Sequence, residues 1–542
     1  MKVLSRTVSL LLALVLSQRT LAIDAHSLRI RGAQSINTWR LRHNTPSPAP
    51  DASLVAQSAA ASEFPVFTFT QPLDHFFNST NATFEQRYWV STRHYTPGTG
   101  APVIVIDGGE TSGEDRLVYL DTGIGDILAK ATGGVAVVLE HRYYGESVGV
   151  QNFTTDSLRW LNNTQALEDS ANFMRNVKLG GIDEDLTAPN TPWIYYGGSY
   201  AGARSAIMKV LYPDIVYGAI ASSGVTHAAL SNWEYMDVIR TYADPICSAN
   251  LVQSIATVDR LLNDTDARST VKGLFNLTTL ESDQDFASVL NIPLGAWQEI
   301  NWDPTISSTD FDDFCTALNA NTSTLADTEK TVTLPGNVTV NIALLSYADY
   351  MKTNFISDCL SQSTAEECYG TNDDSLYQGT DLSQTWRLWT FQYCTQWGFL
   401  TTAPPDPAQF PPIISRVLDL EYEHKICVQA FPPGEHFTVP PLPDVESVDV
   451  LGDYDIAADR LAIIDGEQDP WRPNTPHSQY GAKNRTDTIV RPFKLIPGAV
   501  HHWDENGLAN STQEPPEIQK IHREEIEFVQ AWLADYNKTR TA

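Results

Sequence analysis

The stretch Thr191-Pro-Trp-Ile-Tyr-Tyr-Gly-Gly-Ser-Tyr-Ala-Gly202 decides the fold of this chain. Its apolar run, Trp193 to Tyr196, predicts a buried strand that two glycines break, and a helix-compatible run from Tyr200 to Leu211 follows Ser199. A strand, a glycine turn, a serine and a helix form the setting of a nucleophile elbow. Ala201 stands where the usual Gly-x-Ser-x-Gly pattern ends in glycine. The pattern alone fits a surface serine in a glycine-rich turn equally well, so the rest of the chain decides.

Other short apolar runs alternate with helical segments along the chain. Continuous β-branched runs suit strands that are buried on both faces of a parallel sheet. The segment from Thr164 to Val177 has its apolar side chains on one helical face, and a helix with Ile518, Ile521, Phe528 and Trp532 closes the chain. This alternation predicts an α/β core. The other predicted strands are Pro102–Asp107, Val135–Glu140, Gly218–Ser222, Arg460–Asp465 and Val490–Ile496.

The strand-helix rhythm stops between residues 227 and 445, where we expect mostly helices and long loops. A chain of 542 residues exceeds one ordinary core, so we expect an α/β-hydrolase fold with a large, mostly helical, disulfide-bearing cap inserted after the nucleophile region. The predicted parts are a signal peptide (1–22), a leader or pro-segment (23–62), the first hydrolase part (63–226), the cap (227–445) and the second hydrolase part (446–542).

All six cysteines lie in the middle region, which predicts a separately stapled unit in an exported chain. Their pairing stays open, with Cys359 and Cys368 only the nearest pair. No Cys-x-x-Cys is present, so neither a zinc nor a redox motif is indicated. The six are Cys247, Cys315, Cys359, Cys368, Cys394 and Cys427.

The beginning of the chain and its sequons predict export. Lys2 and Arg6, an apolar run from Val8 to Leu16 and the small-residue site before residue 23 resemble a secretory signal. No later run is long enough to cross a bilayer, so we expect a secreted or vacuolar/lysosomal protein without a membrane partner. The eleven Asn-x-Ser/Thr sequons predict glycosylation at Asn78, Asn81, Asn152, Asn162, Asn263, Asn276, Asn321, Asn337, Asn484, Asn510 and Asn537.

The charge balance excludes one class of partner. Asp and Glu outnumber Lys and Arg by 66 to 36, and the net charge of −30 would repel a nucleic-acid backbone. An excess of acidic residues also fits a protein that functions at low pH, because protonation of the carboxylates reduces the repulsion between them. We therefore expect no nucleic-acid binding.

Two late loops supply the partners that a serine nucleophile needs. A serine hydroxyl is activated by a histidine base, whose ring a carboxylate orients. In the α/β-hydrolase order the acid and the histidine follow late strands. Asp469 follows the strand that ends at Asp465, with Asp465 and Glu467 as rivals; His501 follows the strand that ends near Ile496, with His502 as its neighbour. No zinc-binding pattern surrounds these residues, so no metal or cofactor is expected.

Backbone amides near the serine are expected to stabilise the oxyanion of acyl transfer. One donor is the N–H of Tyr200, which follows the nucleophile. The second is expected from Gly109 in the loop Asp107-Gly-Gly-Glu110, because glycines let a backbone approach a substrate closely. A plain turn is the alternative for this loop.

At these residues the chain resembles the serine peptidases that include lysosomal Pro-X carboxypeptidase, dipeptidyl peptidase II and the fungal acid prolyl endopeptidases. The resemblance covers about Phe67 to Trp532, and its marks are specific only together and in this order. They are Phe69-Thr-Gln-Pro-Leu-Asp-His-Phe76, Glu140-His-Arg-Tyr-Tyr-Gly-Glu-Ser147, Leu158-Arg-Trp-Leu161 with Gln165-Ala-Leu167, Gly197-Gly-Ser-Tyr-Ala-Gly202, Phe391-Gln-Tyr-Cys-Thr-Gln-Trp-Gly398, Asp469-Pro-Trp471 and His501-His502.

The resemblance implies Ser199 as nucleophile, Asp469 as orienting acid and His501 as base. It also implies an α/β-hydrolase domain under a helical cap, cleavage after proline in peptide or protein substrates, and often an acidic optimum. Two departures favour endopeptidase action: the loop Ser147-Val-Gly-Val150 lacks the proline-containing run expected of the animal members, and Asp107-Gly-Gly-Glu110 is more similar to the fungal ones. Pro-X carboxypeptidase and dipeptidyl peptidase activities stay open.

Substrate binding is expected to use an aromatic face and a carboxylate. Trp471, beside the acid, offers a flat face to a proline ring, although core packing explains it nearly as well. Glu110, with Glu140 and Glu146, is a candidate for binding a substrate amino terminus, and internal ion pairs with Arg142 or other basic groups are the alternative.

Two function classes outside the peptidases also stay open. A carboxylic-ester hydrolase uses the same triad, and a secreted binding protein can retain the fold without catalysis. The oligomeric state, the pH optimum and the end of the pro-segment are not determined by these patterns.

Overall fold

The computed structural model describes residues 63–77 and 79–541. The predicted signal peptide (1–22), the predicted leader (23–62) and the sequon at Asn78 lie outside the described residues, as does the side chain of Asn537.

An eight-stranded sheet forms the base of the molecule, in the order β1-β2-β4-β3-β5-β6-β11-β12. The six strands from β4 to β12 run parallel, and β1 and β2 pair antiparallel at one edge. This strand order, with the serine after β5, is that of an α/β-hydrolase. The strands are β1 (Val66–Pro72), β2 (Thr83–Ser91), β3 (Val103–Asp107), β4 (Val135–Leu139), β5 (Trp193–Gly198), β6 (Val216–Ser222), β11 (Leu461–Gly466) and β12 (Phe493–Ile496).

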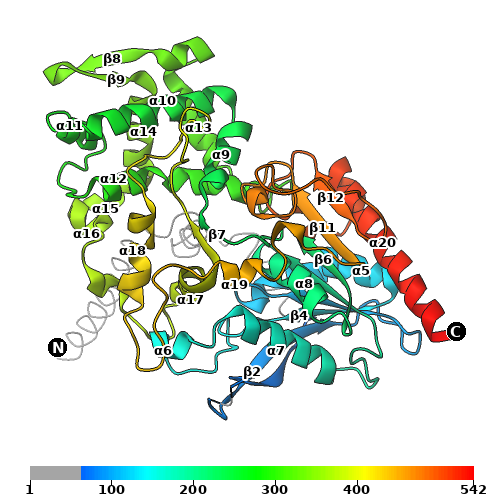
Figure 1. The fold of residues 1–542 in the computed structure, drawn as a ribbon. Helices are drawn as coiled ribbons and strands as arrows, with labels where there is room; N and C mark the ends of the chain where they lie inside the picture. The colour runs from blue at the N-terminus through cyan, green and yellow to red at the C-terminus, as the bar shows by residue number, and fades with distance from the viewer. Residues whose placement is uncertain (1–62, 78, 542) are drawn as a thin grey trace, which may run out of the picture.

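Helices cover both faces of the sheet because successive strand residues point to opposite sides. In β3, Val105 packs against α7 and α8, whereas Ile104 and Ile106 pack in the cluster that contains α5 and α20. Figure 1 shows α7 and α8 in front of the sheet and α20 along its far edge. The helices of this part are α4 (Val118–Asp121), α5 (Ile124–Thr132), α6 (Thr155–Leu158), α7 (Asn163–Asn176), α8 (Tyr200–Leu211) and α20 (Pro516–Thr541).

A second, mostly helical body lies between β6 and β11 in the chain and beside the sheet in space (Figure 1). Its core includes Phe286, Phe314, Tyr347 and Trp397 and is continuous with residues of the hydrolase part such as Tyr200. This body is the cap, and its main helices are α9 (Trp233–Tyr242), α10 (Pro245–Leu262), α11 (Arg268–Leu274), α12 (Asp283–Leu290), α13 (Asp310–Leu318), α14 (Ile342–Met351), α15 (Ser357–Leu360), α16 (Ala365–Tyr369), α17 (Trp386–Gln392) and α18 (Leu420–Ala430). A short helix, α19 (Glu446–Asp449), leads the chain back to the sheet. The chain thus passes from the sheet into the cap after β6 and returns through α19 before β11. We propose that the boundaries between the two parts lie at 226/227 and 445/446.

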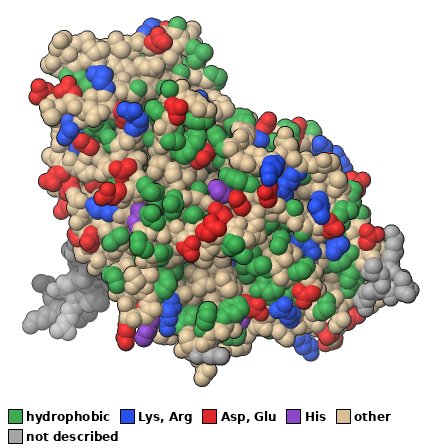
Figure 2. Space-filling model, in the orientation of Figure 1, with side chains coloured by type: hydrophobic (Ala, Val, Ile, Leu, Met, Phe, Trp, Pro, Cys, Tyr) green, Lys and Arg blue, Asp and Glu red, His purple; other side chains and the backbone are tan. Residues whose placement is uncertain are grey.

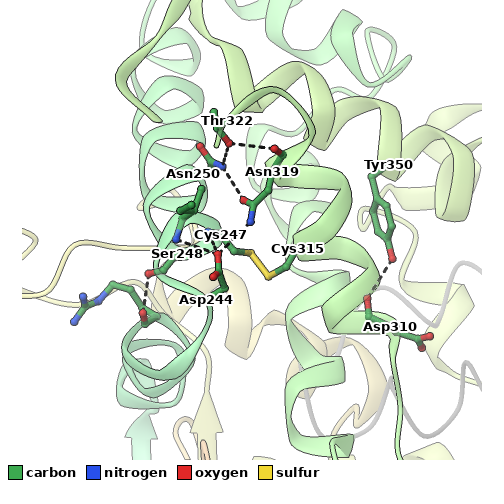
Figure 3. Close-up of a disulfide and its surroundings, with 11 residues drawn as sticks. Asp244, Cys247, Ser248, Asn250, Asp310, Cys315, Asn319, Thr322 and Tyr350 are labelled. Atoms are coloured by element: carbon green, nitrogen blue, oxygen red, sulfur yellow. Dashed lines mark hydrogen bonds between the residues drawn. A yellow bond between two sulfur atoms is a disulfide. The ribbon is translucent and has the colours of Figure 1, made fainter. Parts of the chain in front are cut away.

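Three disulfides staple the cap: Cys247–Cys315, Cys359–Cys368 and Cys394–Cys427. The first joins α10 to α13, and beside it Asn250 donates to Asn319 Oδ1 and to Thr322 Oγ1 (Figure 3). The pairing that the sequence left open therefore includes the nearest pair and two bridges over longer distances in the chain.

Short strands are the main difference from the expected fold. Strand β1 follows a period-two alternation, Phe67-Thr-Phe-Thr70, which is typical of a half-buried strand, but it is not among the strands predicted above. The cap also contains an antiparallel hairpin, β8 (Thr331–Leu334) with β9 (Val338–Asn341), and a parallel pair, β7 (Ala229–Ser231) with β10 (Gly398–Leu400). These strands have only three or four residues, too few to establish a period.

Candidate active site

Ser199 lies in a strained turn between β5 and α8. Its backbone has φ 59° and ψ −124°, a conformation that non-glycine residues rarely adopt. The Ser199 N–H donates to the Ser222 carbonyl oxygen at 2.9 Å, which fixes the turn against the end of β6. The side chain stays half-exposed although its neighbours are buried. The geometry is that of a nucleophile elbow.

Close packing explains the glycines around this serine. A Cβ on Gly197 would overlap the Ala201 carbonyl oxygen, and one on Gly198 would overlap the carboxylate of Glu505. A Cβ on Gly202 would lie 2.6 Å from the Ser222 carbonyl oxygen. Ala201 itself is accommodated, because its methyl group faces Gly109, which has no side chain. The departure from the usual pattern is therefore sterically allowed.

The structure brings the three residues predicted for catalysis into one hydrogen-bonded chain. His501 Nε2 lies 2.9 Å from Ser199 Oγ. His501 Nδ1 lies 2.9 Å and 3.1 Å from the two carboxylate oxygens of Asp469. Asp469 follows β11 and His501 follows β12, so the three residues meet at the carboxyl end of the parallel strands. A base within reach of the serine and a carboxylate behind the base are the arrangement that nucleophilic catalysis requires.

Asp469 is fully buried but is held as a carboxylate. Burial alone would raise its pKa, but the charge of His501 and hydrogen bonds from His501, Ser223 and the Trp471 N–H lower the pKa below its usual value. The pKa of Asp469 therefore lies below its usual value in spite of full burial.

The rivals of Asp469 have other partners. Asp465 pairs with His477 Nδ1 at 2.6 Å. Glu467 accepts a hydrogen bond from the Gly498 N–H at 3.0 Å. Each of these carboxylates therefore stabilises the loops that hold the triad. Neither takes the place of Asp469 beside His501.

His502 turns away from its neighbour because its backbone is left-handed, with φ 37°. Its ring pairs with Glu505 at 2.9 Å, and its N–H donates to Ser223 Oγ at 2.9 Å. Burial would lower the pKa of His502, but the charge of Glu505 raises it above its usual value. Burial would likewise raise the pKa of Glu505, but His502, Arg116 and a hydrogen bond from Tyr119 lower it to about 2. In this ion pair Glu505 is buried and His502 is half-buried, and the Glu505 carboxylate lies directly under Gly198 of the elbow.

The two amides predicted for the oxyanion site differ in their present partners. Tyr200 is the first residue of α8, where backbone N–H groups lack an acceptor within the helix. The Gly109 N–H donates to Asp107 Oδ1 at 3.0 Å. Asp107 also binds Arg204 and the Tyr195 hydroxyl. The predicted donor Gly109 is therefore engaged by a buried carboxylate in this structure.

The carboxylates predicted to bind a substrate amine are not equivalent. Glu140 is fully buried and pairs with Arg87 at 2.7 Å, and Glu146 pairs with the same arginine at 3.2 Å. Arg142, the partner considered from the sequence, pairs instead with Asp169. Ion pairing thus accounts for Glu140.

Glu110 is different because one of its carboxylate oxygens, Oε2, is buried without a hydrogen-bond partner. Burial raises the pKa of Glu110 above its usual value, although the charges of Arg116, His501 and His502 lower it.

Trp471 lies in an aromatic cluster between the sheet and the cap. Its ring packs edge-on against Tyr235 and Phe399, with centroids 5.2 Å and 5.1 Å away. Its Nε1–H donates to Gln298 Oε1 at 2.8 Å. Trp471 is only 6% exposed, so the ring is held rigidly beside the acid.

The comparison with protein families matches most of the chain. The family described as Serine carboxypeptidase S28 matches residues 71–526. The chain belongs to this family. It is therefore a serine peptidase by family, as its resemblance predicts, and the folded part between β1 and α20 carries the match.

Relatives of this family member are similar over most of their length. "Probable extracellular serine carboxypeptidase" of Arthroderma benhamiae is 39% identical over 508 residues, covering 89% of this chain and 70% of that protein. "Serine protease vicPa" of Bipolaris victoriae is 29% identical, covering 80% of this chain and 83% of that protein. "Lysosomal Pro-X carboxypeptidase" of Mus musculus is 24% identical, covering 91% of this chain and 93% of that protein.

The compartments in two of these names, extracellular and lysosomal, are the two that the sequence predicts for this chain. Among the described residues, no helix combines the length and the apolar character needed to cross a bilayer. The sequon asparagines at 81, 263, 276, 321, 337, 484 and 510 are exposed, whereas Asn152 and Asn162 are half-buried and bond locally.

The family mark at Phe391–Gly398 contains site residues to which the sequence assigned no role. Its π-helix, η8 (Tyr393–Trp397), ends at two residues with left-handed backbone, Gly398 (φ 71°) and Phe399 (φ 60°). A Cβ on Gly398 would overlap the Ala229 carbonyl oxygen, so β10 can pair closely with β7. Trp397 packs edge-on against Tyr200, with centroids 5.3 Å apart. A π-helix followed by strained backbone is a recurring feature of functional sites.

Proposed function

We propose that this chain is a secreted, acid-active serine endopeptidase that hydrolyses peptide bonds on the carboxyl side of proline. Ser199 is the nucleophile, His501 the general base and Asp469 the acid that orients it. The observation that carries the proposal is the continuous hydrogen-bonded chain from Ser199 Oγ through His501 to Asp469, with 2.9 Å at each step.

The reaction follows from these contacts. Ser199 Oγ attacks the carbonyl carbon of the proline residue while its proton passes to His501 Nε2, and the Tyr200 N–H stabilises the developing oxyanion. His501 gives the proton to the leaving amine, which leaves an ester between Ser199 and the proline carboxyl group. A water molecule then loses a proton to His501 and attacks the ester carbonyl, and His501 returns the proton to Ser199 Oγ as the product ending in proline is released. Gly109 would contribute a second donor only after releasing Asp107.

Proline selection is proposed to use the aromatic cluster. A pyrrolidine ring is short, apolar and rigid, and the flat rings of Trp471 and Phe399 offer it a matching surface. The name of one relative, the lysosomal Pro-X carboxypeptidase of Mus musculus, carries the same specificity.

Endopeptidase action is favoured because the carboxylates considered for a substrate amine either pair with an arginine or have a raised pKa. Glu140 and Glu146 share Arg87, and burial raises the pKa of Glu110 above its usual value. The unpartnered Oε2 of Glu110 favours a second candidate, a dipeptidyl peptidase that binds the amino terminus there.

The decisive test is mass-spectrometric mapping of products from a long peptide with one internal proline and both termini blocked, at pH 4 to 5. We expect cleavage after proline by the wild-type chain and by Ser511→Ala, an exposed serine in η12 (Ser511–Gln513). Ser199→Ala is expected to lose roughly 10⁴-fold or more in turnover while its melting temperature is kept.

The other outcomes separate the alternatives. Cutting only after the amino end is unblocked assigns a dipeptidyl peptidase, and cutting only after the carboxyl end is unblocked assigns a carboxypeptidase. Faster hydrolysis of a simple fatty ester at matched concentration would assign an ester hydrolase. A wild-type chain that a serine-directed organophosphonate does not label would be a binding protein.

A further inference from the structure

Three metal-ligating side chains meet where the chain crosses between the sheet and the cap. His227 follows β6 on the way into the cap. Asp449, the last residue of α19, and Asp453, the first of η9 (Asp453–Asp455), lie on the way back to β11. Figure 1 shows α19 at this junction, and Figure 2 shows acidic side chains gathered over it, with a histidine beside them.

The donor atoms of the three residues are as close together as the ligands of one cation. His227 Nδ1 lies 2.7 Å from Asp453 Oδ1 and 3.6 Å from Asp449 Oδ1, and one donor atom of each residue lies within 4.8 Å of the others. Ligands about 2.1 Å from a tetrahedral zinc ion lie about 3.4 Å apart. The side chains are 25%, 18% and 41% exposed for His227, Asp449 and Asp453, so a cation can enter from solvent.

Neighbouring groups orient these ligands, as outer groups do in metal sites. The Ala228 N–H donates to Asp449 Oδ1 at 2.8 Å, and the Tyr454 N–H donates to Asp453 Oδ1 at 2.6 Å. The His227 ring stacks on the Tyr454 ring, with centroids 4.2 Å apart. Each ligand is therefore held before any cation binds.

The cluster also has an excess of negative charge. Within residues 63–77 and 79–541, the ion pairs of Asp449 and Asp453 are with His227, and no lysine or arginine pairs with either. A divalent cation would balance this charge.

We propose that His227, Asp449 and Asp453 bind a divalent cation of the zinc class, with water completing the coordination. An imidazole nitrogen with two carboxylates suits Zn²⁺ better than Ca²⁺, which prefers oxygen ligands alone. The site joins both chain crossings, so its role is to fasten the cap to the sheet. It does not depend on the proposed proline specificity.

The site is also linked to the loop of the catalytic acid. The His227 N–H donates to the Asn474 carbonyl oxygen at 3.0 Å, and the Tyr454 hydroxyl donates to the Pro473 carbonyl oxygen at 2.9 Å. Both acceptors lie in η10 (Arg472–Asn474), which begins directly after Trp471. A bound cation would therefore stiffen the segment that follows Asp469.

The test measures metal content and stability of the full glycosylated chain after chelation and dialysis against Zn²⁺. The variant is His227→Gln with Asp449→Asn, which keeps an oxygen acceptor for the Ala228 N–H. The matched control is His94→Gln, which removes another half-buried histidine–aspartate pair, with Asp126 at 2.8 Å.

We expect one more Zn²⁺ per chain in wild type and control than in the double variant. At a zinc concentration about 100 times the dissociation constant, only wild type and control should gain about 2 °C or more in melting temperature.

Two further measurements keep the outcome decisive. Equal melting temperatures of all three proteins in chelator would show that the variant is folded, and Asp453→Asn alone is expected to weaken zinc binding about tenfold or more. If the double variant and wild type take up the same amount of zinc, or if zinc raises neither melting temperature, the site is only an ion-paired cluster. Tighter binding of Ca²⁺ than of Zn²⁺ would overturn the assigned metal class.

Discussion

The two sides of the nucleophile are built from different kinds of interaction. On the sheet side, Ser199, His501 and Asp469 are joined by hydrogen bonds of 2.9 Å, and the ion pair His502–Glu505 lies beneath them. On the cap side, Trp397 and Phe399 contribute rings that pack edge-on against Tyr200 and Trp471.

This difference suggests a division of roles. Charged hydrogen bonds are directional, so the sheet side can fix where a proton moves. Aromatic packing depends on shape and excludes water, so the cap side can decide which substrate fits. Changes on the sheet side should therefore reduce turnover for every substrate, and changes on the cap side should alter selectivity.

The largest effect is expected from Asp469→Asn on the sheet side. The asparagine side chain has the same shape as the aspartate side chain. Its amide no longer accepts the hydrogen bond from His501 Nδ1–H in the same way, which favours the wrong tautomer of the His501 ring. We expect kcat to fall by about 10⁴-fold for all substrates, measured by stopped-flow or discontinuous peptide hydrolysis. Glu467→Gln, a change on the same loop at the carboxylate that binds the Gly498 N–H, should stay within about tenfold. Equal losses in the two variants would contradict the assignment of the acid.

A smaller and selective effect is expected from Trp471→Leu at the border of the cap. Loss of the flat ring should lower kcat/KM for cleavage after proline by about 10- to 200-fold, the range that one pocket contact provides. Cleavage of a small activated ester should change much less, because the triad is intact.

The control for this change is Trp233→Leu in α9, whose ring packs on Phe410 at 4.7 Å and not on Trp471. It should leave the ratio of proline to alanine cleavage unchanged. A Trp471→Leu enzyme with the same ratio as wild type would show that this ring is only part of the core.

Features that depend on neighbouring residues could be predicted from the sequence. The elbow needs only a strand, small residues and a helix in succession, and α8 begins and ends at the predicted residues, Tyr200 and Leu211. Asp469 and His501 were predicted because each follows a late strand in the order that the fold requires.

Features that depend on distant residues could not be predicted in this way. Gly198 is needed because the carboxylate of Glu505 lies against it, although the two are far apart in the chain. Trp397 reaches Tyr200 only because the cap folds back over the sheet. The same holds for the bond from Gly109 to Asp107, since a glycine-rich loop has no side chains that indicate where its N–H groups point.

The smallest effect on turnover is expected from His502→Gln, which breaks the ion pair between the half-buried His502 and the buried Glu505. The lowered pKa of Glu505, about 2 against an ordinary 4.5, gives stability that is complete above pH 4.5 and is lost as the pH falls towards 2. The raised pKa of His502 gives stability that is complete below its ordinary value of 6.5 and is lost as the pH rises through the higher folded value. The pair therefore stabilises the fold most between about pH 4.5 and 6.5. In that window we expect the variant to lose on the order of 2 kcal/mol of unfolding free energy, measured by denaturant titration, with less loss at pH 9 and at pH 2.

Arg491→Gln, which breaks an exposed pair with Asp459, should change stability by about 0.5 kcal/mol or less at every pH. A His502→Gln loss that does not vary with pH would mean that the ring contributes packing alone, and a large fall in its kcat would mean that the second histidine belongs to the catalytic side of the comparison.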